Sequence, residues 1–102
     1  MKKIIDGFRY DTEKADKVCD IWEANPRDFK HIDAALYRTK RSGRFFIAGK
    51  GGPMTMFARR VDQNSWSGGS GIIPLSEEDA LRYAEQYAST DVVELFFKVE
   101  EA

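Results

Sequence analysis

The sequence predicts an α+β fold: a small antiparallel sheet of three to four strands with two main helices packed on one face. A hairpin pattern at residues 36–48 would form the centre of the sheet. Apolar residues at helical spacing predict one helix before this hairpin and another near residue 80. The chain has 102 residues and no linker long enough to divide it. We therefore expect a single domain over residues 1–102.

The N-terminal quarter predicts a short hairpin followed by a helix. Asp6-Gly7 suits a turn with positive φ between two extended segments. The apolar residues that follow have the i, i+3, i+4, i+7 spacing of one helix face, at Ala15, Val18, Cys19 and Trp22. We expect Asp11 or Thr12 to cap this helix and Asn25-Pro26 to end it.

The centre of the chain predicts a hairpin and then a segment that fits two structures. Residues 36–39 and 44–48 are strand-like and flank a loop that contains Gly43. The glycines and proline of residues 49–53 predict a turn. Residues 54–61 fit either a helix that begins at Pro53 or a third strand, and we favour the strand.

The C-terminal part predicts a polar loop over residues 62–71, a short strand and two helical segments. Ile72-Ile73 is the strand, and Pro74 places it at an edge of the sheet or at its own end. Ser76 suits the N-cap of a helix, with Asp79 at the return position of a capping box. Residues 92–99 are predicted to be helical rather than extended.

Charge is distributed unevenly although the formal net charge is only −1. Residues 1–60 hold 14 basic and 8 acidic side chains, whereas residues 61–102 hold 2 basic and 9 acidic ones. No acidic residue lies between Asp33 and Asp62. Asymmetry of this kind indicates a charged partner, although two halves that pack together would partly cancel their fields.

The hairpin at residues 36–48 is the most informative candidate for binding. Its loop is rich in cations, and its strands carry Tyr37, Phe45 and Phe46. Cations with aromatic rings between them can hold phosphates while the rings stack on bases. In the simpler interpretation, Phe45 and Phe46 point to opposite faces of the sheet and the cations are solvated.

Trp66 is the second candidate, because it stands alone among glycines and serines. An exposed tryptophan is a frequent hot spot of protein interfaces. Such a ring more often folds back over a sheet and anchors its loop, and we favour that interpretation.

Enzymatic chemistry finds little support in the sequence. Cys19 and His31 are the only thiol and imidazole, so they are the only possible nucleophile–base pair. They cannot supply a tetrahedral zinc site by themselves. The glycines around Lys50 do not have the spacing of a phosphate-binding loop. We expect no enzymatic activity, no metal and no cofactor.

The lone cysteine and the short apolar runs predict the cellular environment. One cysteine cannot form an internal disulfide, and no apolar run approaches the ~18 residues of a membrane span. We therefore expect a cytoplasmic protein that does not enter a membrane and is either a monomer or a homodimer.

Several short motifs occur in a characteristic order, at residues 10–12, 36–41, 45–46, 51–54, 64–69 and 72–76. This run resembles a group of small uncharacterised proteins carried by phages, plasmids and conjugative elements of Gram-positive bacteria. Relatives often have Gly-Glu-Gly-Gly where this chain has residues 49–52, so Lys50 departs from their pattern. The resemblance implies an accessory factor that binds and blocks a host machine, as anti-CRISPR proteins do.

These observations, together with the resemblance, predict a non-enzymatic accessory binding protein of a mobile element or phage that acts by protein contact. Inhibition of a host defence machine, as by an anti-CRISPR protein, is one form of this role. The alternative is a small nucleic-acid-binding module that uses the basic region at residues 38–60. The residues expected to contact the partner are the cations of this region and the exposed-loop tryptophan: Arg38, Lys40, Arg41, Arg44, Lys50, Arg59, Arg60 and Trp66.

Overall fold

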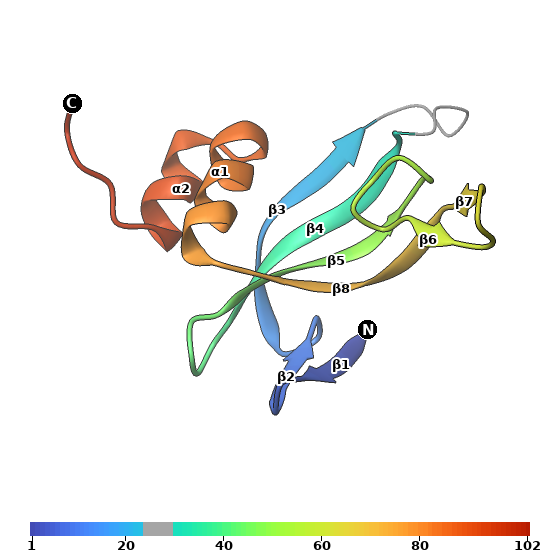
Figure 1. Cartoon of the computed structure of the whole chain (residues 1–102). Coiled ribbons are helices and arrows are strands. Elements are labelled where there is room, and N and C mark those ends of the chain that lie inside the picture. Colours follow the sequence, from blue (N-terminus) through green and yellow to red (C-terminus); the bar gives the residue numbers. More distant parts are fainter. Residues whose placement is uncertain (24–29) are drawn as a thin grey trace.

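A four-stranded antiparallel sheet forms the centre of the computed structural model, which describes residues 1–23 and 30–102. Its strand order is β3-β4-β5-β8, and two further pairs, β1-β2 and β6-β7, lie outside it (Figure 1). The elements are β1 (Lys2–Ile5), β2 (Phe8–Asp11), β3 (Ala15–Glu23), β4 (Ile32–Thr39), β5 (Phe45–Gly51), β6 (Arg59–Arg60), β7 (Trp66–Ser67), β8 (Gly69–Leu75), α1 (Glu77–Tyr87) and α2 (Thr90–Phe96). The predicted α+β fold class is confirmed.

The sheet buries apolar side chains on both of its faces, because the side chains of a strand alternate. One face packs against α1 and α2 through a cluster that includes Leu36, Ile47 and Ala84. The other face holds a smaller cluster around Phe46, which is covered by the β1-β2 hairpin through Tyr10. The sheet is therefore the middle layer, with helices on one face and a small hairpin on the other.

The helix predicted between a cap at Asp11 or Thr12 and a stop at Asn25-Pro26 is wrong, because Ala15–Glu23 form strand β3. Lys17 pairs with Tyr37 and Cys19 with Leu36, so Val18 is an extra residue in a β-bulge. Asp11 and Thr12 therefore cap no helix, and the Asp11 side chain instead accepts a hydrogen bond from the Glu13 N–H. The predicted stop at Asn25-Pro26 lies outside the described residues.

The bulge explains why β3 imitates a helix in sequence. Val18 and Ile21 are both buried against the helices, three residues apart, although strict alternation would place them on opposite faces. Trp22, predicted to lie on the same buried stripe, is 60% exposed. A bulged strand thus reproduces part of a helical pattern over a few residues.

Both predicted hairpins are present. Asp6 and Gly7 have φ angles of 51° and 82°, the positive values that the turn between β1 and β2 requires. In the second hairpin, β4 and β5 are joined by residues 40–44, with Gly43 at a φ of 66°. The Thr39 hydroxyl accepts a hydrogen bond from the Arg44 N–H at 2.9 Å and closes this loop.

The segment after Ala48 differs from the prediction. Residues 49–51 continue β5 instead of forming a turn, because Gly49 pairs with both Ala34 and Gly71. Of residues 54–61, only Arg59–Arg60 form a strand. Ile72 and Ile73 do lie in a strand, and Pro74 lies at the sheet edge as predicted.

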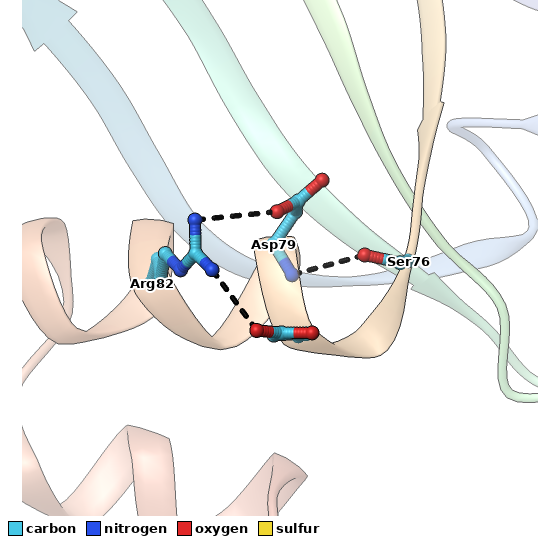
Figure 2. Close-up of polar contacts among 4 residues, drawn as sticks. Ser76, Asp79 and Arg82 are labelled. Atoms are coloured by element: carbon cyan, nitrogen blue, oxygen red, sulfur yellow. Dashed lines mark hydrogen bonds and ion pairs between the residues drawn. The ribbon is translucent and has the colours of Figure 1, made fainter.

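Helix α1 begins where the sequence predicts. The Ser76 side chain accepts a hydrogen bond from the Asp79 N–H at 3.1 Å (Figure 2). The Asp79 carboxylate lies 3.8 Å from the Arg82 guanidinium, which also donates to Glu78 at 2.9 Å. Helix α2 begins at Thr90, before the predicted helical segment 92–99, covers the first five residues of that segment and ends at Phe96.

A hydrogen bond joins the end of α1 to the end of β3 and makes a pH-dependent contribution to stability. The Tyr87 hydroxyl donates to Glu23 Oε1 at 2.8 Å. Burial, and next this hydrogen bond, raise the pKa of Tyr87 from its ordinary value of 10.0 to about 12. Since the folded state holds this proton more tightly, the stabilisation is complete below pH 10 and is lost as the pH rises towards 12.

We therefore expect the melting temperature of the native protein to fall more steeply above pH 10 than that of the Tyr87→Phe variant. The variant lacks the titrating hydroxyl but keeps the ring. Thermal unfolding followed by circular dichroism across this pH range measures the difference. Parallel curves for the two proteins would contradict the assignment.

Candidate binding site

The cations predicted to form one surface lie at opposite ends of the sheet. Arg38, Lys40, Arg41 and Arg44 surround the β4-β5 loop. Lys50 lies five residues along β5 from Phe45, about 17 Å away at roughly 3.4 Å per residue. Arg59, Arg60 and Trp66 belong to the β6-β7 pair, which lies at the same far end (Figure 1). The structure therefore divides the predicted surface into two.

Three of the four loop cations contact groups of their own chain. Lys40 Nζ lies 3.8 Å from Asp16 Oδ1. The Arg38 guanidinium carbon lies 6.0 Å from the centre of the Phe45 ring. The Arg44 guanidinium carbon lies 3.6 Å from the centre of the Phe8 ring, a distance that permits a cation–π contact. Arg44 thus connects the β1-β2 hairpin to the start of β5.

Arg41, the fourth loop cation, lines a surface hollow with residues from the N-terminal hairpin. The hollow has a volume of about 470 Å³ and is lined by Ile4, Gly7, Arg9, Lys14 and Arg41. Three of these five residues are cations and none is an acid. We call this feature the basic hollow.

Local structure places each cation of the basic hollow. Arg9 pairs with Ile4 across the β1-β2 hairpin, so their side chains share one face of it. Lys14 follows a tight turn in which its N–H donates to the Asp11 carbonyl at 3.2 Å. Arg41 lies in the β4-β5 loop.

The cations of the basic hollow are not paired with acidic side chains of the described residues. Within residues 1–23 and 30–102, Arg9, Lys14 and Arg41 form no ion pair with any acidic side chain. All three side chains are exposed. Like charges brought together on a surface attract a group of opposite charge, and arginine can bind a carboxylate through two hydrogen bonds. The site is therefore suited to carboxylate or phosphate groups.

Sequence reasoning identified only one of these three cations. Arg9 and Lys14 lie outside the acid-free stretch, and the sequence predicts a helix at Lys14 where the structure has a turn before β3. The signal that could have found Arg9 is the Asp6-Gly7 turn, because a two-residue turn sets Ile4 opposite Arg9.

The far end of the sheet presents a separate surface. Trp66 is 58% exposed, so the favoured interpretation that its ring folds back over the sheet is wrong. Trp66 pairs with Arg60, whose guanidinium donates to the backbone carbonyls of Asp62 and Gln63. These hydrogen bonds direct the Arg60 guanidinium towards its own turn, so it is not oriented to bind a ligand.

Cys19 and His31, the only possible nucleophile–base pair, lie far apart. Cys19 pairs with Leu36, whereas His31 precedes β4 and lies five residues before Leu36, about 17 Å away at roughly 3.4 Å per residue. Burial raises the pKa of the Cys19 thiol, which opposes formation of the reactive thiolate. In the described part of the chain, no group of three or more His, Cys, Asp or Glu side chains could hold a metal ion.

Comparisons of this chain with known protein families, with curated proteins and with solved structures found no match. No helix of residues 1–23 and 30–102 is long and apolar enough to cross a membrane. The resemblance to proteins of mobile elements remains a prediction from the sequence motifs. The basic hollow is therefore the feature of this structure that bears on function.

Proposed function

We propose that this protein is a non-enzymatic binding module whose basic hollow receives acidic side chains of a partner protein. The observation that carries the proposal is the convergence of Arg9, Lys14 and Arg41 on one hollow whose lining contains no acid. Such a site supplies electrostatic complementarity, which accelerates association and selects an acidic partner.

A protein partner suits the surroundings of the hollow better than a nucleic acid does. Two of the three hairpin rings that could have stacked on bases are inside the molecule, since Phe45 is 4% exposed and Phe46 is fully buried. The third, Tyr37, is half-buried and stacks on Phe46. Ile4, which lines the hollow, is 67% exposed and offers an apolar contact beside the cations. An apolar residue among arginines is typical of protein interfaces.

The resemblance to mobile-element proteins suggests the kind of partner. Small accessory proteins of such elements often bind and block a host machine. We propose that the partner is a host protein with an acidic segment, and that binding inhibits it. An anti-CRISPR role is one form of this proposal.

The proposal predicts a charge-dependent affinity for acidic peptides. A fluorescent polyglutamate peptide should bind the native protein at about 20 mM salt and dissociate as salt is raised, because surface charges are screened. The double variant Arg9→Glu with Arg41→Glu should bind at least about tenfold more weakly, because two attractions become repulsions. Fluorescence anisotropy measures both effects.

The matched control is Lys50→Glu with Arg60→Glu, which changes the net charge equally at the far end of the sheet. This control should retain most of the affinity. Equal losses in the two double variants would show that only the total charge matters and would contradict a local site. Tighter binding of a single-stranded oligonucleotide than of the peptide would instead favour the nucleic-acid alternative.

A further inference from the structure

The outer edge of β8 carries backbone groups whose direction follows from the hydrogen bonds of the β4-β5 hairpin. The Thr39 N–H donates to the Arg44 carbonyl at 2.8 Å, and the Gly52 N–H donates to the His31 carbonyl at 2.9 Å. In an antiparallel pair, alternate residues direct their N–H and C=O groups to the same neighbour. The even-numbered residues of β5 therefore bond to β4, and the odd-numbered residues bond to β8.

Each odd-numbered residue of β5 pairs with an odd-numbered residue of β8. Ser70, Ile72 and Pro74 must then direct their backbone groups away from β5, towards the open edge of the sheet (Figure 1). Two observations agree with this assignment. Pro74 has no N–H and would weaken the ladder if it faced β5. The Ser70 carbonyl accepts a hydrogen bond from Arg59 Nη2 at 3.1 Å, from outside the central sheet.

We propose that two copies of this chain pair through β8, antiparallel, about a two-fold axis at Ile72. The two Ile72 residues then exchange two backbone hydrogen bonds. At each flank, the Ser70 N–H of one copy donates to the Pro74 carbonyl of the other. The Ser70 carbonyl faces a proline without an N–H, but Arg59 already satisfies it. All outward backbone groups of residues 70–74 are thereby bonded.

If the two-fold axis is moved by one residue along β8, the outward backbone groups of residues 70–74 form fewer hydrogen bonds. A two-fold axis at Gly71 would direct the Ile72 N–H towards the Ser70 carbonyl, which Arg59 occupies. An axis at Ile73 would set Pro74 opposite Ile72 and leave the Ile72 carbonyl without a donor. The pattern of one proline and one capped carbonyl therefore selects the register centred on Ile72.

Side chains of β8 also fit a second copy. Gly69–Leu75 contains no charged residue, although charges are a usual device against pairing at an exposed edge. In the proposed register, Ile73 of one copy lies opposite Gly71 of the other. The space beside Gly71 is open, since a Cβ built there would meet no atom within 4 Å. The large side chain of Ile73 in one copy therefore has free space beside Gly71 of the other copy.

The pair Ser70→Pro and Ser70→Ala tests the interface. Both variants remove the exposed hydroxyl, but only proline removes the outward N–H and with it one hydrogen bond at each flank. We expect the native protein and Ser70→Ala to change from 11.7 kDa towards twice that mass as concentration rises. Ser70→Pro should dimerise about tenfold or more weakly. Sedimentation equilibrium measures the masses.

Amide hydrogen exchange of the native protein provides a test that needs no variant. The Ile72 N–H should exchange more slowly as concentration rises, because it gains a partner only in the dimer. The Ile73 N–H, which bonds to β5, should show no such dependence. A mass of 11.7 kDa at every concentration would overturn the proposal. A dimer with a concentration-independent Ile72 exchange rate would overturn it as well.

Discussion

Gly49→Ala is expected to destabilise the protein by roughly 3–6 kcal/mol, a large part of the stability of a domain of this size. Gly49 has a φ of 151°, a conformation that residues with a side chain rarely adopt. A Cβ at this position would lie 2.5 Å from Ala34 Cα and 2.5 Å from the Asp33 carbonyl oxygen. Both are backbone atoms of the neighbouring strand β4, so the sheet itself would have to separate.

Gly71→Ala is the matched control, because Gly71 pairs with Gly49 in the adjacent strand. Its Cβ would meet no atom within 4 Å, and we expect a change within about 1 kcal/mol. Urea denaturation compares the two variants through their midpoints and slopes. Similar midpoints for both variants would show that β4 does not approach Gly49 as closely as the structure places it.

Phe46→Ala is expected to cost about 3–5 kcal/mol and to release the β1-β2 hairpin from the sheet. The Phe46 ring is fully buried, stacks on Tyr37 at 5.2 Å between centres, and meets Tyr10 edge-on at 5.4 Å. Tyr10 is the buried residue through which the hairpin contacts this cluster. Without the Phe46 ring, Tyr10 loses its contact with the sheet and the β1-β2 hairpin is released. The hairpin residues that line the basic hollow then separate from Arg41.

Phe45→Ala is the comparison for this prediction. Phe45 is also buried, but it stacks on Phe97 at 4.8 Å on the helix-covered face. We expect a similar loss of stability with no release of the hairpin. Limited proteolysis at native conditions measures the difference, because cleavage in residues 1–14 should accelerate only in Phe46→Ala. Equal acceleration in both variants would contradict the separate roles of the two faces.

The sequence could predict the elements whose local chemistry decides their structure. Asp6-Gly7 forms the expected turn, and Ser76 caps the expected helix. Strand β3 could not be recognised, because the bulge at Val18 is caused by pairing with β4. A helix and a bulged strand can show the same spacing of apolar residues over a few positions. The two are distinguished only when the partner strand is known.

The candidate site was predictable only in part for a related reason. Arg41 was identified because it belongs to a dense local cluster of cations. Its neighbours in the hollow, Arg9 and Lys14, are distant in sequence and are brought to it by packing of the β1-β2 hairpin. Conversely, Lys50 is close to Arg41 in sequence, but the extended conformation of β5 carries it to the other end of the sheet.

The central claim, that the basic hollow binds acidic groups, is tested most directly by mapping peptide contacts on the native protein. Nuclear magnetic resonance spectra recorded during titration with a polyglutamate peptide report each backbone amide separately. We predict that the amides of Gly7, Arg9, Lys14 and Arg41 shift together with a single affinity, while those of Arg60 and Trp66 remain unchanged. Shifts confined to the Arg60–Trp66 end, or no shifts at low salt, would contradict the claim.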